Sequence, residues 1–203
     1  MFRRHRISDG YPLDSVERRR WILTNVPPGG VGAEIGVFRG HFSVAIAEQL
    51  QPRKLYLVDP WTKLGESFGY GEISYTNNDM LTTRQALDEV HARMARFEGQ
   101  IEVEIVEDYG VNFCAELTEP LDWAYLDAVN RPDLVLANLE AIDRVLLPHG
   151  RIMGDDWVLD PAHHNAGIMR AVNDFIRSHD YEILTAGYHE QWCLRRTPDY
   201  PST

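Results

Sequence analysis

Residues 31–50, VGAEIGVFRGHFSVAIAEQL, decide the fold of this chain. An apolar run is followed by a turn that contains Gly36 and Gly40, and the turn opens a helical segment. Glycine suits such a turn because the backbone can bend tightly and a ligand can approach without meeting a Cβ atom. The stretch therefore predicts a strand, a ligand-binding turn and a helix, which is the first unit of an α/β fold.

The rest of the chain alternates short apolar or β-branched runs with longer helical patterns, which is typical of βαβ units on a mostly parallel sheet. Seven strands are predicted, at residues 31–36, 54–59, 101–108, 121–127, 150–155, 181–187 and 190–196. The connection between the last two is too short for a parallel crossover, so we expect them to form an antiparallel hairpin at the end of the sheet. The predicted fold is a doubly wound, mixed seven-stranded sheet with helices on both faces.

Three predicted helices have recognisable ends, and one of them begins with Thr82 and Gln85 at capping-box spacing. The helix before the first strand offers Asp14 or Ser15 as its N-cap. The helix before the fifth strand begins at Pro132, and we expect Pro148 with Gly150 to end it.

Length and composition limit the class of protein. We expect one domain over residues 1–203, with an N-terminal helical segment at 1–29 and a ligand-binding core at 30–196. No stretch reaches the ~20 apolar residues that cross a bilayer, and the basic start MFRRHR lacks a following apolar segment. We therefore expect no membrane partner, no export and a cytoplasmic location. Cys114 and Cys193 fit reduced, buried thiols better than a disulfide.

The formal net charge of -11 disfavours nucleic acid as a partner, because phosphate backbones are bound by basic surfaces. A small molecule is the better prediction.

Acidic residues mark the first three strands, near the edge where ligands bind in open α/β sheets. Glu34 stands where a dinucleotide-binding turn has its first glycine, so it would repel a pyrophosphate and attract an amino group or a sulfonium. Asp59 is placed to accept hydrogen bonds from ribose hydroxyls, and Trp61 follows closely. Asp108 is placed to accept from an adenine amino group beside Tyr109. These residues predict an acidic, adenosine-sized crevice, although Glu34 could simply cap its loop and both aspartates could be ordinary strand-end polarity.

At these motifs the chain resembles class I S-adenosylmethionine-dependent methyltransferases, which have a Rossmann-like fold. The similar segments are VGAEIGVFRGHFSVAIAEQL, KLYLVDPW, VED, DWAYLDA and GRIMGDDW, and the macrocin-type sugar O-methyltransferases are the most similar branch. The resemblance implies that Glu34, Gly36 and Gly40 surround the methionine portion of S-adenosylmethionine. It also implies that Asp59 binds the ribose and that Asp108 binds the adenine. Phe38, which stands where many of these enzymes have a glycine, completes the predicted cofactor contacts together with Trp61, Tyr109 and Asp127.

Three aspartates follow the fourth and fifth strands, namely Asp127, Asp155 and Asp156. Neighbouring parallel strands lie about 4.8 Å apart, so the three carboxylates can converge. Hard oxygen ligands suit Mg²⁺, or less well Mn²⁺ or Ca²⁺, rather than zinc, and the macrocin-type branch holds a divalent cation with such residues. A cation site is predicted. In the metal-free alternative, the pair at the fifth strand only caps it and Asp127 contacts only the cofactor.

A substrate hydroxyl on that cation, beside Asp127, would attack the sulfonium methyl group, and His163 or His164 would take its proton. Either histidine could instead serve the N-terminus of the following helix. Asp160 is interpreted as a turn residue and Trp157 as packing or a pocket wall.

Residues 61–79 are rich in Gly, Tyr and Ser and are interpreted as a flap near the ligand, or else as an ordinary surface insertion. This loop, the N-terminal helix or a partner subunit of a homodimer would form the substrate pocket.

We expect an O-methyltransferase acting on a hydroxyl of a sugar, a glycosylated metabolite or a polyphenol. A non-catalytic protein that binds S-adenosylmethionine or a nucleotide is the alternative, and Glu34 disfavours a nicotinamide-dependent oxidoreductase.

Overall fold

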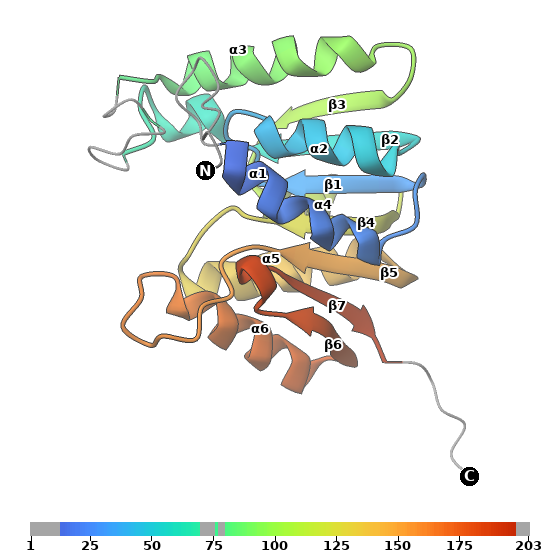
Figure 1. Cartoon of the computed structure of the whole chain (residues 1–203), viewed down its shortest axis with the longest axis vertical. Helices are drawn as coiled ribbons and strands as arrows, with labels where there is room; N and C mark the ends of the chain where they lie inside the picture. Colours follow the sequence, from blue (N-terminus) through green and yellow to red (C-terminus); the bar gives the residue numbers. More distant parts are fainter. Residues whose placement is uncertain (1–12, 70–75, 77–79, 198–203) are drawn as a thin grey trace, which may run out of the picture.

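The computed structural model describes residues 13–69, 76 and 80–197. Seven strands form one sheet in the order β3-β2-β1-β4-β5-β7-β6 (Figure 1). The strands are β1 (Val31–Ile35), β2 (Lys54–Asp59), β3 (Glu102–Glu107), β4 (Leu121–Leu126), β5 (Leu146–Gly154), β6 (Tyr181–Ala186) and β7 (Trp192–Arg196). β7 runs antiparallel to both β5 and β6, while the pairs among β1 to β5 are parallel. The predicted fold class, including the C-terminal antiparallel pair, is confirmed.

Helices cover both faces of this sheet (Figure 1). One face carries α1 (Leu13–Arg19) with its 3₁₀ continuation η1 (Arg20–Asn25), α2 (His41–Leu50) and α3 (Thr83–Met94) with η4 (Ala95–Phe97). The other face carries α4 (Gly110–Glu116), α5 (Pro132–Val145) and α6 (Ala166–Ser178). Short 3₁₀ turns follow β2 and β6, at η2 (Trp61–Leu64) and η5 (Tyr188–Glu190).

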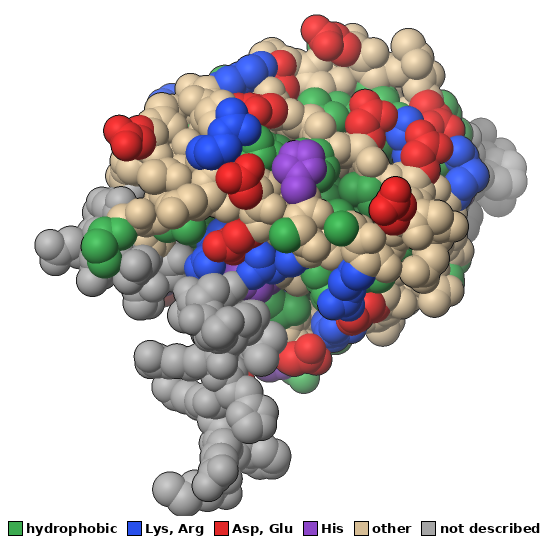
Figure 2. Space-filling view, turned by 90° about the horizontal axis from the view of Figure 1, so that it is seen from above, with side chains coloured by type: hydrophobic (Ala, Val, Ile, Leu, Met, Phe, Trp, Pro, Cys, Tyr) green, Lys and Arg blue, Asp and Glu red, His purple; other side chains and the backbone are tan. Residues whose placement is uncertain are grey.

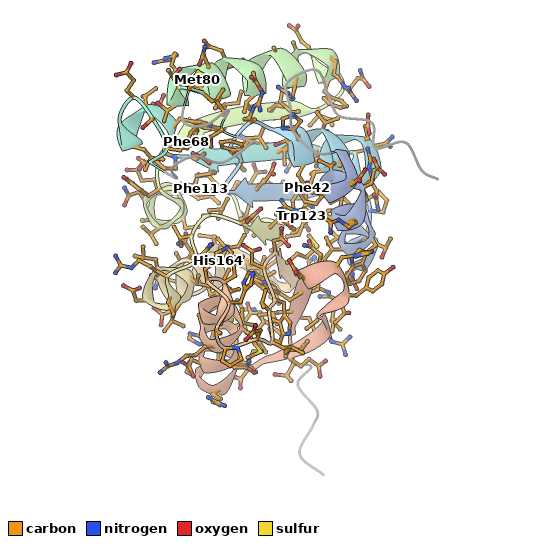
Figure 3. All side chains as sticks on the ribbon, turned by 60° about the vertical axis from the view of Figure 1, so that its left-hand side comes forward. Phe42, Phe68, Met80, Phe113, Trp123 and His164 are labelled. Carbon is orange, nitrogen blue, oxygen red and sulfur yellow. The ribbon has the colours of Figure 1, made fainter. Side chains whose placement is uncertain are left out.

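A separate apolar core fills each side of the sheet. Phe42 and Trp123 belong to the core under α1, α2 and α3, and Phe113 belongs to the core under α4, α5 and α6 (Figure 3). In α6, Ile168, Val172 and Phe175 repeat at helical spacing and are all buried, which is why this segment forms a helix against the sheet.

The capping box predicted at Thr82 and Gln85 and the helix start predicted at Pro132 are confirmed, but the other two predicted helix ends are wrong. α1 already includes Asp14 and Ser15, so neither caps it. α5 ends at Val145, and β5 begins at the next residue, before Pro148 and Gly150. The cause is pairing with β4, whose register shifts between Leu121 and Trp123 and leaves residues 147–150 of β5 as a bulge. A bulge tolerates proline because no ladder hydrogen bond is needed from its nitrogen.

The predicted flap lies only partly within the described residues. Its first part folds as η2, and Phe68 packs edge to face on Phe38 of the glycine turn with 4.8 Å between ring centroids. Ser67 forms an isolated bridge with Thr82 at the start of α3. Residues 70–75 and 77–79 lie outside the described part, so the flap itself stays a prediction.

Cys114 and Cys193 are buried free thiols, as predicted. In the part of the chain that the structure describes, no helix is both long enough and apolar enough to cross a membrane.

Candidate active site

The ends of β1 and β4 meet where the order of the strands along the chain reverses. The Asp127 N–H donates to the Ile35 carbonyl oxygen at 2.8 Å. Gly36 has a φ of 93°, and a Cβ atom there would lie 2.1 Å from the Asp127 carbonyl oxygen. Only glycine fits such a position, because both the positive φ and the close backbone oppose a side chain. In open α/β sheets this reversal point is where ligands bind.

Asp59 stabilises the glycine turn, residues 36–40, by hydrogen bonds to its backbone. Its Oδ2 accepts hydrogen bonds from the N–H groups of Val37 and Phe38 at 3.0 and 2.9 Å, and its Oδ1 accepts from the Trp61 N–H at 3.1 Å. Burial raises the pKa of this carboxyl, and the three N–H donors act against that rise. A ribose would have to share oxygens that already accept hydrogen bonds from the turn, so the ribose contact stays a prediction. The structural role of Asp59 in holding the turn was not indicated by any sequence pattern.

Trp61 lies inside the core rather than in an open crevice. Its side chain is fully buried, and its indole Nε1–H donates to the Phe38 carbonyl oxygen at 2.8 Å. This contact supports the turn from within, so any effect of Trp61 on a ligand in this conformation passes through the shape of the turn.

Glu34, on β1 next to the turn, is 2% exposed and accepts a hydrogen bond from the Ser43 hydroxyl of α2. Burial raises the pKa of the Glu34 carboxyl to about 8, and the neighbouring carboxylates of Asp127 and Asp59 add to the rise. A buried carboxyl with acidic neighbours favours a cationic ligand, since a positive charge would stabilise its ionised form. Ser43 had no signal in the sequence, because a serine inside a helix has many ordinary explanations.

Asp108 is held in place after β3. Its Oδ1 accepts from the Tyr109 N–H at 2.7 Å and from Asn112 Nδ2 at 2.9 Å, while Oδ2 pairs with Lys63 Nζ of η2 at 2.7 Å. The Lys63 contact is the largest cause that lowers the pKa of Asp108 to about 2. The Tyr109 side chain is exposed beside it. Asp108, the residue predicted to contact adenine, is therefore an ionised and oriented carboxylate after β3.

The three aspartates after β4 and β5 come close together, and Arg19 of α1 lies among them. Arg19 Nη1 contacts Asp127 Oδ2 at 2.8 Å, and Arg19 Nη2 contacts Asp155 Oδ2 at 2.5 Å. Burial raises the pKa of Asp127 to about 6, of Asp155 to about 7 and of Asp156 to about 6. For all three, a neighbouring aspartate adds to the rise and Arg19 opposes it.

Asp155 is also held from the C-terminal hairpin. Its Oδ1 accepts from the Gln191 side-chain amide, whose own oxygen accepts from the Tyr125 hydroxyl at 2.9 Å. The Trp192 indole N–H donates to the Asp155 carbonyl oxygen at 2.9 Å. Gln191 is fully buried. Gln191 and Tyr125 had no signal in the sequence, because they lie in predicted strands and have no motif around them.

As placed, these residues do not fit a divalent cation. Within the described residues, no group of three or more His, Cys, Asp or Glu side chains has the arrangement of a metal site. The Arg19 guanidinium takes one oxygen of Asp127 and one of Asp155, and Gln191 takes the second oxygen of Asp155. The predicted carboxylates do come together, but a positive group of the chain itself lies between two of them.

His163 and His164 lie on the loop between β5 and α6, where Figure 3 labels His164. Their ring centroids are 4.2 Å apart. His163 Nδ1 accepts the Asn165 N–H at 3.2 Å, so in a neutral His163 ring the proton is on Nε2. The His164 side chain is exposed.

Asn165 connects this loop to the aspartates. Its Oδ1 accepts from Asn130 Nδ2 at 2.5 Å, and its side chain also hydrogen-bonds the Asp156 carboxylate. Asp160 accepts the Ala162 N–H at 2.9 Å with its Oδ1, which confirms it as a turn residue. Trp157 is buried in the core under α5 and α6, which agrees with a packing role.

Residues 33–157 match the methyltransferase domain family, and they span the glycine turn, Asp59, Asp108 and all three aspartates. The chain belongs to this family. No curated protein sequence matches the chain. The family match agrees with the general resemblance found in the sequence, whereas the macrocin-type branch stays a prediction.

Solved structures share the fold of this methyltransferase domain. An rRNA methylase from Streptococcus thermophilus superposes with a TM-score of 0.57 at 14% identity, covering 91% of this chain and 95% of its own. The O-methyltransferase TomG from Streptomyces achromogenes, in complex with SAM, gives 0.60 at 18% identity, covering 93% and 81%. The SAH-bound Podospora anserina methyltransferase PaMTH1 gives 0.62 at 12% identity, covering 93% and 80%. At such identities the likeness shows the fold alone.

Proposed function

We propose that this methyltransferase domain transfers the methyl group of S-adenosylmethionine to a hydroxyl group of a small molecule. The observation that carries the proposal is the meeting of Gly36 and Asp127 at the reversal point of the sheet, beside the buried Glu34. The close packing of Gly36 on the Asp127 backbone brings the acidic side chains of Glu34 and Asp127 to one place, which suits a ligand that carries both an ammonium and a sulfonium group.

The residues present fit this methyl donor. S-adenosylmethionine, when bound, supplies a methyl group that its sulfonium already activates. Glu34 would hold the positively charged methionine portion, since binding of a cation stabilises the ionised carboxylate. Asp108 would accept a hydrogen bond from the adenine amino group with a carboxylate that Lys63 keeps ionised. Asp59 would contribute both to the turn and to the ribose contact.

At the acceptor end, the chain positions a hydroxyl and removes its proton. The acceptor oxygen forms a bond to the methyl carbon while the carbon–sulfur bond breaks, and the bonding electron pair stays on sulfur. The hydroxyl proton must leave to a base, for which we propose His164, because the Nδ1 atom of His163 already accepts a hydrogen bond. Asp127 would orient the hydroxyl. The catalytic contribution is mainly positioning of two reactants.

A small acceptor is favoured over RNA, although an rRNA methylase is among the structures with this fold. The net charge of -11 opposes a phosphate backbone. Figure 2 views the molecule from the α3 side, and acidic and basic side chains are mixed there instead of forming a basic face. A divalent cation is not included in the proposed reaction, since Arg19 contacts the oxygens that would bind it.

Two measurements test the proposal. Calorimetry with S-adenosylhomocysteine should show binding at sub-millimolar concentration, which Glu34→Gln weakens. Radiolabelled S-adenosylmethionine should then label members of a library of sugars and polyphenols, with ribosomal RNA as the comparison substrate. Absence of binding contradicts the cofactor assignment, binding without transfer supports the non-catalytic alternative, and transfer to RNA alone contradicts the small-molecule assignment.

A further inference from the structure

Arg19 lies among the aspartates of this site, and the proposed reaction gives it no role. Its guanidinium joins two carboxylates that come from different strands, Asp127 after β4 and Asp155 after β5. Arginine is well suited to such a bridge, because its planar fork directs N–H groups at two acceptors at once. The bridge places one positive charge at the point where the sequence predicts a cation.

The fold fixes Arg19 in this position. Arg19 is the last residue of α1, and the following turn of η1 buries Ile22 and Leu23 completely in the core. Trp21 packs edge to face on Tyr188 with 5.0 Å between ring centroids. The neighbouring Arg20 points to the outside, where it pairs with Glu17 and Glu48. The end of α1 therefore presents Arg19 to the aspartates, and the start of η1 presents Arg20 to Glu48 of α2.

A divalent cation would compete with this guanidinium for the same atoms. The two ion pairs that Arg19 forms with the aspartates are made to their Oδ2 atoms, and Gln191 already holds Oδ1 of Asp155. Asp155 is 5% exposed, so it has little access to solvent ions while Arg19 is in place. A cation could enter only if the guanidinium left, and a second positive charge beside it would be repelled.

We propose that Arg19 is a built-in cation that takes the place of a divalent metal between Asp127 and Asp155. The charge of Arg19 holds these two carboxylates together. The domain does not bind a divalent cation at this point while α1 is docked, and removing the guanidinium frees the Oδ2 atoms of Asp127 and Asp155 to bind one. The inference goes beyond the proposed reaction and does not rest on it.

The test measures Mn²⁺ binding to the full chain by electron paramagnetic resonance. The samples are the wild type, Arg19→Ala and the matched control Arg20→Ala, whose arginine is adjacent but does not face the aspartates. Removal of one positive charge a few ångströms from the ion should tighten Mn²⁺ binding by at least about tenfold in Arg19→Ala. The wild type and Arg20→Ala should bind equally weakly, and adding Asp127→Asn to Arg19→Ala should abolish the gain.

Arg19→Gln is the second variant, because it keeps a hydrogen-bonding side chain if Arg19→Ala does not fold. Wild-type protein that binds Mn²⁺ as tightly as the Arg19 variants would overturn the inference, as would Arg19 variants that gain no affinity. Wild-type binding that Asp127→Asn removes would also overturn it. None of these measurements uses S-adenosylmethionine, so they succeed or fail independently of the proposed reaction.

Discussion

The two halves of the candidate site are built by different forces. The cofactor half is the part proposed to bind S-adenosylmethionine, namely the glycine turn with Glu34, Asp59 and Asp108. In it, Asp59 holds the turn through backbone N–H groups only 21 and 22 residues away in the chain. The acceptor half is the group of three aspartates after β4 and β5, where Arg19 reaches Asp127 across 108 residues and Gln191 reaches Asp155 across 36. One half depends on backbone shape and the other on the balance of buried charges. The cofactor half should therefore be sensitive to added volume, and the acceptor half to changes of charge and pH.

The largest expected effect is from added volume in the cofactor half. In Gly36→Ala the new Cβ atom would lie 2.1 Å from the Asp127 carbonyl oxygen, so the end of β4 must move. We expect a loss of at least about 3 kcal/mol in the free energy of unfolding, as for other strained and overpacked buried positions. Urea unfolding measures it.

Gly99→Ala is the matched control for Gly36→Ala. Gly99 also has a positive φ, 75°, but a Cβ atom added there would have no heavy atom within 4 Å other than those of Gly99 and its two neighbours in the chain. Its loss should be only the ~1 kcal/mol of a left-handed backbone. Equal losses in the two variants would show that the contact with Asp127 has no importance.

The second effect is a change of charge in the acceptor half. Arg19→Met leaves three neighbouring carboxylates without their counter-charge, and we expect a loss of about 2 kcal/mol near pH 8, below the range for fully buried pairs because Arg19 is partly exposed. Arg19 opposes the rise of the pKa of Asp127 and Asp155, so its removal raises both pKa values further.

The pH dependence gives the sign of this effect. A carboxyl whose pKa is higher in the folded protein than in the unfolded chain stabilises the fold less as pH rises through its folded pKa. The loss in Arg19→Met should therefore shrink toward pH 5, where the carboxyls are protonated. Thermal unfolding at pH 5 and pH 8 measures it, with Arg20→Met as a control that changes little at either pH. A loss that is the same at both values would contradict the charge explanation.

The third effect is a pH dependence at Glu34, whose pKa is raised to about 8 by burial and by carboxylates of both halves, Asp127 and Asp59. Between pH values near 4.5 and 8, the folded protein holds a proton on Glu34 that the unfolded chain does not, so the contribution of Glu34 to stability falls as pH rises from about 4.5 to about 8. Binding of the S-adenosylhomocysteine ammonium favours the ionised form. Its affinity should therefore increase up to about tenfold per pH unit between pH 6 and 8. Calorimetry should find that Glu34→Gln removes this slope, and a slope kept in the variant would assign it to another group.

The smallest effect is expected at Asp108, at the exposed edge of the cofactor half. Asp108→Asn removes the ionic contact with Lys63 but keeps an acceptor oxygen for the Tyr109 N–H. Affinity for S-adenosylhomocysteine should fall only a few-fold, and the difference from wild type should shrink at high salt because exposed charges are screened. Calorimetry at two salt concentrations measures both. A hundredfold loss would mean that Asp108 is a principal cofactor ligand.

Much of this could be predicted from the sequence. All seven strands could be located, because each leaves a short apolar or β-branched run bounded by turn residues. The glycine turn and the strand-end aspartates could be placed because parallel strands end at one edge of the sheet. The end of α5 could not be predicted, since pairing of Leu146 with Leu121 of β4 overrides the local signals of Pro148 and Gly150. The helix cap failed for a related reason, as local sequence offers several equivalent starts.

By itself, then, the sequence determined the α/β sheet, the position of the glycine turn and the gathering of Asp127, Asp155 and Asp156 at one edge. These follow from short-range periodicity and from the geometry of parallel strands. Only the tertiary structure decided which charge lies among those aspartates. Arg19 is one of several arginines in a basic stretch, and nothing around it distinguishes it from Arg20. Packing of α1 and η1 against the sheet turns one inward and the other outward, because the fold fixes directions that no local pattern records.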